Sequence, residues 1–216
     1  LSADLYHTFG KVQTNLLVEG FYTILDDVFA LRDMDDAADG GKVKERYNGS
    51  GATVRGFNVE GRAAFTRWFE LQAGVTLQQS RYKEPEFWSE DAEVPPVRRM
   101  FRTPDTYGYF TASFKPVRNF TADLSGTCTG SMLVQHMAGS GVAQDVAVST
   151  PSFFDMNIRL SYDVRIYKEI TMQLYGGVQN LFNAYQKDFD KGVDRDSGYI
   201  YGPSLPRLSL IHISEP

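Results

Sequence analysis

Apolar and polar residues alternate with a period of two along most of the chain. The clearest case is the segment 69–82, in which Leu71, Ala73, Val75 and Leu77 alternate with polar residues. Because successive side chains of a strand point to opposite faces, this period predicts β-strands. The expected strands are residues 2–8, 12–25, 52–63, 69–82, 106–114, 120–132, 152–164 and 170–181, with a further aromatic-rich strand beginning at Tyr199.

The connections between these strands alternate in length. The short ones are residues 9–11, 64–68, 115–119 and 165–169, and the long ones are residues 26–50, 83–104, 133–151 and 183–198. In an up-and-down antiparallel sheet, all short turns then lie at one end and all long loops at the other. This asymmetry is typical of outer-membrane barrels. Soluble barrels mix their loop lengths less regularly, and β-sandwiches use Greek-key crossings.

The expected strands are long enough to cross a bilayer, which takes about 9–11 tilted residues. One face of each strand is nearly free of charge, and aromatic residues lie near strand ends: Phe65, Trp68 and Phe69 at one end, Tyr82 and Phe182 towards the other. Main-chain groups in lipid must be paired within the protein, so such a sheet has to close. We therefore expect an all-β fold, an antiparallel up-and-down transmembrane barrel of which this chain forms about eight or nine strands.

Composition narrows the class of protein further. The 216 residues are 42% hydrophobic and 23% charged, and no apolar run approaches the length of a spanning helix. Aromatic residues reach 13%, which fits the aromatic girdles of a barrel. Cys128 is the single cysteine, so a disulfide framework or cysteine metal cage is not expected. The net charge of -5 and the lack of a basic stripe argue against nucleic acid as a partner.

A corner motif near the C-terminus carries a family resemblance. A G-V-x-N-L-F-N corner is followed by a polar loop and Y-x-Y-G-P-x-x-P-R. This arrangement resembles the last hairpin of TonB-dependent outer-membrane receptors, especially the Bacteroidetes type. The motif residues, to which we assign a structural role, are Asn180, Leu181, Phe182, Asn183, Tyr201, Gly202, Pro203, Pro206 and Arg207.

The resemblance implies a transporter in the bacterial outer membrane. Its barrel would have roughly 22 strands and a plugged lumen, and residues 1–207 would form the C-terminal part of that barrel. Outer-membrane lipid, a nutrient ligand and the TonB system, acting through a plug upstream of this chain, would be its partners, and no enzymatic turnover is expected. A ferric siderophore, haem or corrinoid is the first expectation for the substrate. A glycan or peptide importer partnered by a surface lipoprotein is the second, and a barrel with an adhesin or enzymatic role is an alternative of another class.

The last residues depart from the family pattern, which would continue after Arg207 with an alternating strand ending in an aromatic residue. Residues 208–216, Leu-Ser-Leu-Ile-His-Ile-Ser-Glu-Pro, match the translation of a transposase-type sequencing adapter. We therefore expect this tail to be non-native and the sequence to be truncated at both ends. Sequencing of the intact genomic locus tests this expectation.

Candidate ligand-binding residues fall into two groups. Trp88, Arg98, Arg99 and Arg102 lie in a long loop, where they could bind an anionic or aromatic ligand. Charged-face residues would line the lumen: Asp155, Arg159 and Tyr175, along with Glu19, Glu60, Glu70, Gln72, Asp123, Asn157 and Gln173. Their simpler role is to solvate the channel wall.

No metal or catalytic motif is recognisable. His7 and His136 are far apart, and HExxH, GxSxG and P-loop patterns are absent from the sequence, so no metal site, catalytic residue or resident cofactor is expected. Two acidic loop clusters could bind Ca²⁺, although neither has EF-hand spacing. They are Asp33, Asp35, Asp36 and Asp39, and Asp188, Asp190, Asp194 and Asp196. Solvated acidic loops are the simpler interpretation.

Overall fold

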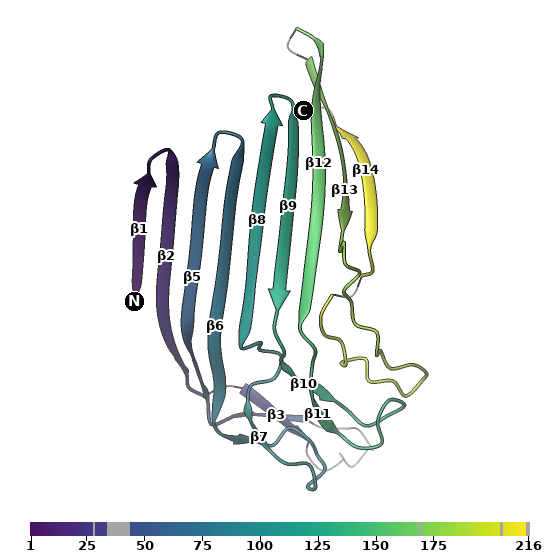
Figure 1. The fold of residues 1–216 in the computed structure, drawn as a ribbon. Helices are drawn as coiled ribbons and strands as arrows, with labels where there is room; N and C mark the ends of the chain where they lie inside the picture. Colours follow the sequence, from purple (N-terminus) through teal and green to yellow (C-terminus); the bar gives the residue numbers. More distant parts are fainter. Residues whose placement is uncertain (28, 34–43, 169, 204, 215–216) are drawn as a thin grey trace.

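The computed structural model describes residues 1–27, 29–33, 44–168, 170–203 and 205–214. Its main feature is a 10-stranded antiparallel sheet in which neighbours along the chain are mostly neighbours in space (Figure 1). Its strands follow the order β1-β2-β5-β6-β8-β9-β12-β13-β14, with β7 paired to β6. Their bounds are β1 Ser2–Phe9, β2 Val12–Leu25, β5 Ala52–Thr66, β6 Phe69–Glu86, β7 Val97–Arg99, β8 Thr106–Val117, β9 Phe120–Thr129, β12 Phe153–Tyr167, β13 Ile170–Gln179 and β14 Leu208–Ser214.

The eight strands expected from residues 2 to 181 are confirmed. The bounds of β2 match the prediction, whereas β5, β6, β8 and β12 continue further than their alternation indicated. The long connections also contain short strands: the hairpins β3 (Phe29–Asp33) with β4 (Lys44–Asn48), and β10 (Leu133–His136) with β11 (Val146–Ser149).

The prediction of a strand beginning at Tyr199 is wrong. Residues 180–203 and 205–207 form irregular loop segments, and the next strand begins only at Leu208, where it pairs with β13. Tyr199 and Tyr201 are instead buried among loop residues, with 4% and 6% of their surface exposed. The aromatic residues that predicted a strand therefore pack inside the loop and do not contribute to the sheet.

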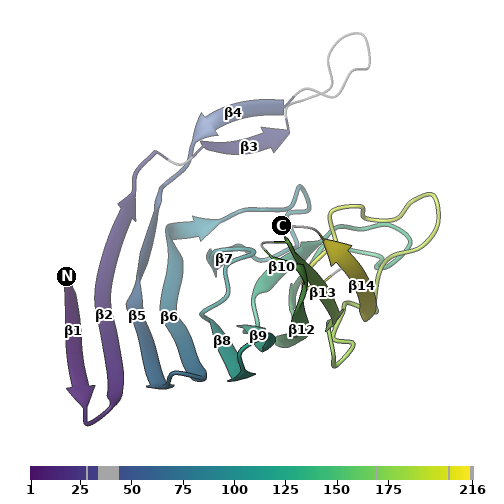
Figure 2. The same cartoon turned by 90° about the horizontal axis from the view of Figure 1, so that it is seen from above.

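The two ends of the sheet differ as expected. Every short turn lies at one end, which is the top of Figure 1, and every long connection lies at the other. We call the end with the turns the short-turn rim. Seen along the strands, the sheet follows an arc (Figure 2). Among the described residues β1 pairs only with β2 and β14 only with β13, so the barrel is not closed in this chain.

The strand register sorts the side chains onto two faces. One row crosses the sheet as Val59, Val75, Gly108, Cys128 and Phe154, each paired with the next. Adjacent rows carry polar residues whose side chains bond across strands. On this polar face Gln72 donates to Glu60 at 2.7 Å, Thr76 donates to Asn58 at 3.0 Å, and Gln173 donates to Asp163 at 2.8 Å.

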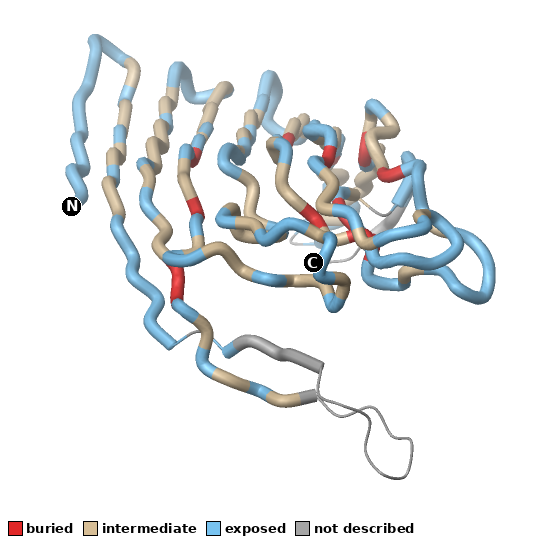
Figure 3. Tube along the Cα trace, turned by 90° about the horizontal axis from the view of Figure 1, so that it is seen from below, coloured by how far each residue is buried: buried red, intermediate tan, exposed pale blue. Residues whose placement is uncertain are grey.

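The apolar face is exposed rather than covered. Phe57 is 63% exposed, Leu77 52% and Leu160 44%, although all three belong to paired strands. Few residues of the sheet are buried, as Figure 3 shows. The part of the chain that the structure describes contains no helix long and apolar enough to cross a membrane. A large exposed apolar surface of this kind marks a face that contacts a membrane or another protein.

Aromatic residues collect at both ends of the apolar face. At the short-turn rim, the rings of Phe65 and Phe69 stack at 5.4 Å, and Trp68 meets Phe114 edge-on at 5.2 Å. Towards the loops, Phe182 lies 5.8 Å from Phe154. Tyr82, expected in the second girdle, instead lines a loop pocket, because it sits beyond the segment of β6 that pairs with β8.

Candidate functional site

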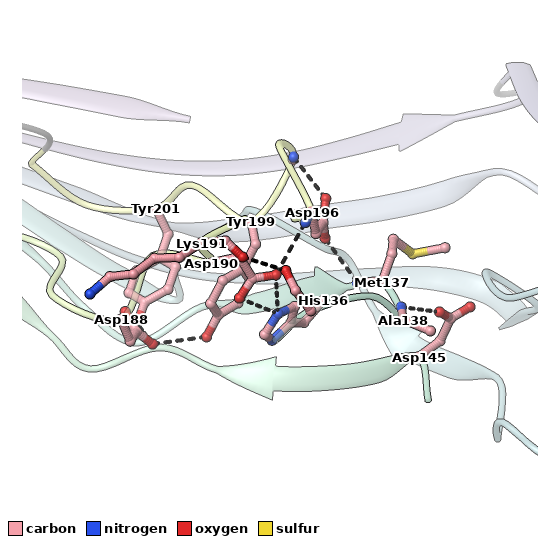
Figure 4. Close-up of polar contacts among 12 residues, drawn as sticks. His136, Met137, Ala138, Asp145, Asp188, Asp190, Lys191, Asp196, Tyr199 and Tyr201 are labelled. Atoms are coloured by element: carbon pink, nitrogen blue, oxygen red, sulfur yellow. Dashed lines mark hydrogen bonds and ion pairs between the residues drawn. The ribbon is translucent and has the colours of Figure 1, made fainter. Parts of the chain in front are cut away.

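The best-packed region lies where the last long loop meets the β10–β11 hairpin. Val134, Tyr199 and Tyr201 form its buried apolar centre, against which Met132, Val148 and Phe153 pack. Polar side chains surround this centre. We call the group His136, Asp188, Asp190, Tyr199 and Tyr201 the loop cluster (Figure 4).

His136 joins the hairpin to the last loop. Its Nε2 lies 3.0 and 2.9 Å from the two carboxylate oxygens of Asp190, and both side chains are more than nine-tenths buried. The imidazole also stacks on the ring of Tyr199, with centroids 3.7 Å apart and planes within 7°. Asp190 further accepts a hydrogen bond from the main-chain N–H of Asp196 at 3.1 Å. Two loops distant in sequence are therefore held together by one buried pair.

Asp188 forms the second polar contact of the loop cluster. The hydroxyl of Tyr199 donates to Oδ2 at 3.0 Å, and the hydroxyl of Tyr201 lies 2.6 Å from both carboxylate oxygens. The two tyrosines thus bury their rings and present their hydroxyls to one carboxylate. A carboxylate can accept from several donors at once, which suits this arrangement.

The hydrogen bonds shift the ionisation of both carboxylates. Burial alone would raise the pKa of Asp188, but hydrogen bonds from Tyr201 and Tyr199 outweigh it and lower that pKa. The hydrogen bond from His136 is the main cause that lowers the pKa of Asp190. Burial, with the neighbouring Asp188, raises the pKa of Tyr199 and of Tyr201. The loop cluster is accordingly held by ionised carboxylates and neutral tyrosines.

Gln186 explains why the segment around Tyr199 is not a strand. Its side chain is 1% exposed; its Oε1 accepts from the main-chain N–H of Tyr201 at 2.7 Å, and its Nε2 donates to the carbonyl of Tyr199 at 3.1 Å. A side-chain amide thus bonds main-chain groups that a neighbouring strand would otherwise bond. The alternation of apolar and polar residues does not predict that a side-chain amide replaces a neighbouring strand in these hydrogen bonds.

Asn180 organises the corner motif. It adopts a positive φ of 50°, which ends β13, and its amide donates to the carbonyls of Ala184 at 3.0 Å and Leu205 at 2.9 Å. Its Oδ1 accepts from the N–H of Ala184 at 2.8 Å. The side chain is 4% exposed; both amide N–H groups donate to the protein, and the amide oxygen accepts one hydrogen bond.

The rest of the motif completes the corner. Asn183 has φ 56°, and its Oδ1 accepts from the N–H of Arg207 at 3.0 Å. Gly202 has φ 69° and lies so close to Phe153 that a Cβ there would fall 2.5 Å from the ring. Leu181 donates its N–H to the carbonyl of Met156, and the carbonyl of Pro203 accepts from Gln186. These contacts give the motif residues an architectural role.

The basic loop candidates contact the protein itself. Arg102 donates to the carbonyls of Ile200 and Gly198, and Arg99 bonds the carbonyl of Ser131 at 2.8 Å and Asp105 at 3.0 Å. Arg98 is more exposed and lies 3.5 Å from Glu84. The structure therefore places Arg99 and Arg102 as braces between loops, and does not gather the arginines around a common space.

Trp88 lies in a separate place, in an aromatic pocket of about 320 Å³ between loops. Its ring meets Phe101 edge-on at 5.3 Å, and Tyr82 and Phe87 also line the space. The sequence indicated Trp88 alone. Phe29 of β3 and Gln135 of β10 also line this pocket. No local sequence pattern predicts that these two residues lie close to Trp88.

The expected lumen candidates share the polar face. The guanidinium of Arg159 lies 4.5 Å above the ring of Tyr175 on the neighbouring strand. Asp155 is on the same face of β12, and its Oδ1 is buried without a hydrogen-bond partner. These residues are remote from the arginine loop in the register, so the structure does not bring the two groups of candidates into one site.

Of the two acidic clusters considered for Ca²⁺, one lies largely outside the described residues and the other is bonded within the protein. Asp35, Asp36 and Asp39 lie outside the described residues, as does the side chain of Asp33. In the other cluster Asp188, Asp190 and Asp196 are bonded to tyrosine, histidine and main-chain donors. Throughout the described ranges, no group of three or more His, Cys, Asp or Glu is arranged to hold a metal ion.

Solved structures show a similar arrangement of strands. The ferric-catecholate import receptor Fiu from K12 E. coli matches over 97% of this chain, with a TM-score of 0.61 and 17% identity. The fold is therefore similar to that of an outer-membrane receptor barrel. The copper transporter OprC matches over 97% of the chain with a TM-score of 0.55 and 13% identity. The outer-membrane transporter YddB from Escherichia coli matches over 84% with a TM-score of 0.55 and 14% identity.

The matched region is only part of each solved receptor. This chain spans 26% of Fiu, 30% of OprC and 28% of YddB. No family model matches the sequence, and no curated protein does. At these identities the likeness concerns the fold of the barrel wall.

Replacing Asn180 should loosen the last loop. Asn180→Ala removes three buried hydrogen bonds and leaves main-chain groups unpaired, which should cost about 2–4 kcal/mol locally. Limited proteolysis of the full-length protein should then cut within residues 181–207 faster than in the wild type. Gln179→Ala, at the adjacent exposed position, is the matched control and should not change the rate. Equal rates for both variants would contradict the role given to Asn180.

Acid should open the loop cluster. The lowered pKa values of Asp188 and Asp190 stabilise the folded loop above the ordinary carboxyl pKa of about 4, and this contribution is lost as the pH falls through the folded values. Hydrogen exchange of residues 186–201 should therefore accelerate below about pH 4. Asp190→Asn should weaken this pH dependence, whereas Asp194→Asn, at an exposed position, should leave it unchanged. An unaltered profile in Asp190→Asn would count against the assignment.

Proposed function

We propose that this chain is part of the barrel wall of a TonB-dependent receptor that imports a scarce nutrient across the bacterial outer membrane. The observation that carries the proposal is the sheet itself: each strand between the two edges is paired on both sides, and the face away from the polar network is apolar and exposed. Such a surface is stable against hydrocarbon and unstable in water.

The similarity of fold supports the same function. Fiu is named as a ferric-catecholate import receptor, and OprC as a copper transporter. In the receptor family that the corner motif resembles, the ligand binds the long loops and plug, and TonB acts on the plug to open a path. This chain would supply wall and loops, with the loop cluster fixing two long loops relative to each other.

A metal complex is the substrate class that we favour: a ferric siderophore, haem or corrinoid. The aromatic pocket around Trp88 supports this choice, because flat aromatic groups of a chelator can pack there. Asp155, Arg159 and Tyr175 would contact a ligand passing along the polar face. A glycan or peptide substrate, taken up with a surface lipoprotein, is the alternative within transport. An adhesin or enzymatic role is the alternative outside it.

Two further assignments belong to this proposal. Residues 1–207 are the native barrel wall, in which the acidic loop around residues 33–39 could bind Ca²⁺, and residues 208–216 are the adapter-derived tail. Main-chain pairing does not depend on side-chain identity except at proline, so β14 occupies the position that the native strand after Arg207 would take.

A charge on the apolar face should prevent stable insertion. Leu160 lies at the middle of β12 and is 44% exposed. Leu160→Arg should destabilise the barrel by about 2–4 kcal/mol if this surface meets the bilayer midplane. Heat-modifiable mobility on gels and outer-membrane yield measure the loss. Thr111→Arg, on the polar face at the middle of β8, should be tolerated; equal tolerance of Leu160→Arg would argue for a water-exposed face.

Import should depend on TonB. A strain that carries the full-length gene as its only iron receptor should grow with a ferric catecholate as the iron source, and should stop growing when either the receptor or TonB is removed. Haemin and cyanocobalamin, supplied to matched auxotrophs, distinguish the other metal complexes. Growth dependent on the receptor but independent of TonB would contradict the mechanism. Rescue only on a glycan or peptide would favour the alternative substrate class.

A further inference from the structure

The short-turn rim carries a row of positive charges. Each short turn contains, or directly adjoins, a lysine or arginine, and all of these side chains are exposed. These rim cations are Lys11, Arg67, Lys115, Arg118, Arg165 and Lys168. The protein as a whole is acidic, with a net charge of -5, and its long loops contain more acidic than basic residues. The short turns therefore carry a net positive charge, whereas the long loops carry a net negative one.

The rim cations are not neutralised by the described residues. None of the ion pairs in the described part of the chain includes one of them. Nearby carboxylates have other partners: Glu70 pairs with Arg62 at 2.5 Å, and Asp123 accepts from Ser113 at 2.5 Å. Glu169 follows Lys168 and lies outside the described residues. Arg165 donates to the carbonyl of Lys168 at 2.6 Å, and none of the rim cations has an ion-pair partner among the described residues.

Aromatic rings lie directly beside these cations. Trp68 and Phe65 flank Arg67 in the chain, and the ring of Tyr167 lies 5.3 Å from the ammonium of Lys168. Aromatic rings at the end of an apolar face mark the level of lipid headgroups in a membrane barrel. Cations at the same level then face phosphate groups.

A cleft at the rim brings both features together. It has a volume of about 550 Å³ and lies between the first two hairpins of the sheet. Lys11 and Gln13 line it from one hairpin, and Phe65, Arg67 and Trp68 from the next. It thus offers an ammonium and a guanidinium for a phosphate, and aromatic surface for the glycerol and upper acyl region.

We propose that the short-turn rim binds the headgroups of anionic phospholipids, with the cleft between Lys11 and Arg67 as the principal site. Guanidinium groups bind phosphate in a bidentate geometry, and ammonium groups add compact charge. Basic groups at a membrane surface attract anionic lipid. Continuity of the rim with the exposed apolar face favours a lipid over a soluble anion. The inference rests on the proposed function, since it requires the sheet to lie in a bilayer.

The test uses the full-length protein in nanodiscs made from equal amounts of phosphatidylglycerol and phosphatidylcholine. Native mass spectrometry after release counts each lipid that stays bound. The wild-type protein should retain phosphatidylglycerol preferentially. The double variant Lys11→Gln with Arg67→Gln should lower that preference by up to about thirtyfold, as expected for loss of two cations at the headgroup level. Lys187→Gln with Lys191→Gln removes two exposed cations at the loop end and should retain the preference.

The possible outcomes separate this inference from the function on which it rests. If the rim variant inserts normally and still prefers phosphatidylglycerol, the lipid site is wrong while the barrel assignment stands. An equal loss in the loop-end control would also overturn the site, because the preference would then follow net charge. If the wild-type protein does not enter the bilayer at all, the proposed function itself fails.

Discussion

Main-chain hydrogen bonding across the antiparallel sheet is the constraint on which the rest of the structure depends. Because the strands of the 10-stranded sheet pair in antiparallel register, with shifts only near the ends of the strands, every second side chain falls on the same face. Polar groups such as Glu60 and Gln72 can then bond across strands on one side. Leu77 and Leu160 remain exposed on the other side, which no described segment of the chain covers. The fold is therefore complete only in an environment that supplies an apolar contact.

The loops are ordered by a different kind of interaction from the sheet. Their order comes from specific side-chain contacts, chiefly the His136–Asp190 pair and the hydrogen bonds around Asn180 and Gln186. These contacts join segments that lie up to 54 residues apart in the chain. In a barrel of this kind the wall provides a rigid frame, and the loop contacts decide the shape that a ligand meets. The loop cluster thus sets the mutual position of two long loops without using a metal or a disulfide among the described residues.

The asymmetry between the two ends extends from loop length to charge. Short turns with Lys11, Arg67 and Lys168 lie at one rim, and acidic residues are concentrated at the other end. A sheet that crosses a bilayer meets two different surfaces. Its ends can differ in charge without affecting the strand register, because main-chain pairing does not involve turn side chains.

Alternation along the sequence determined the eight long strands between residues 2 and 181, their order and the two faces of the sheet, since the period of two in β2 or β6 is a local property of consecutive residues. It gave no sign of the short strands in the long connections. The alternation of short and long connections determined which ends lie together. Tertiary structure alone decided that Tyr199 and Tyr201 are buried in a loop, because Gln186 and Asp188 bond to them across turns with no period. It also decided that Arg99 and Arg102 act as braces and that Trp88 joins a pocket from several loops. Such contacts depend on where distant segments meet, and this information is absent from any local pattern.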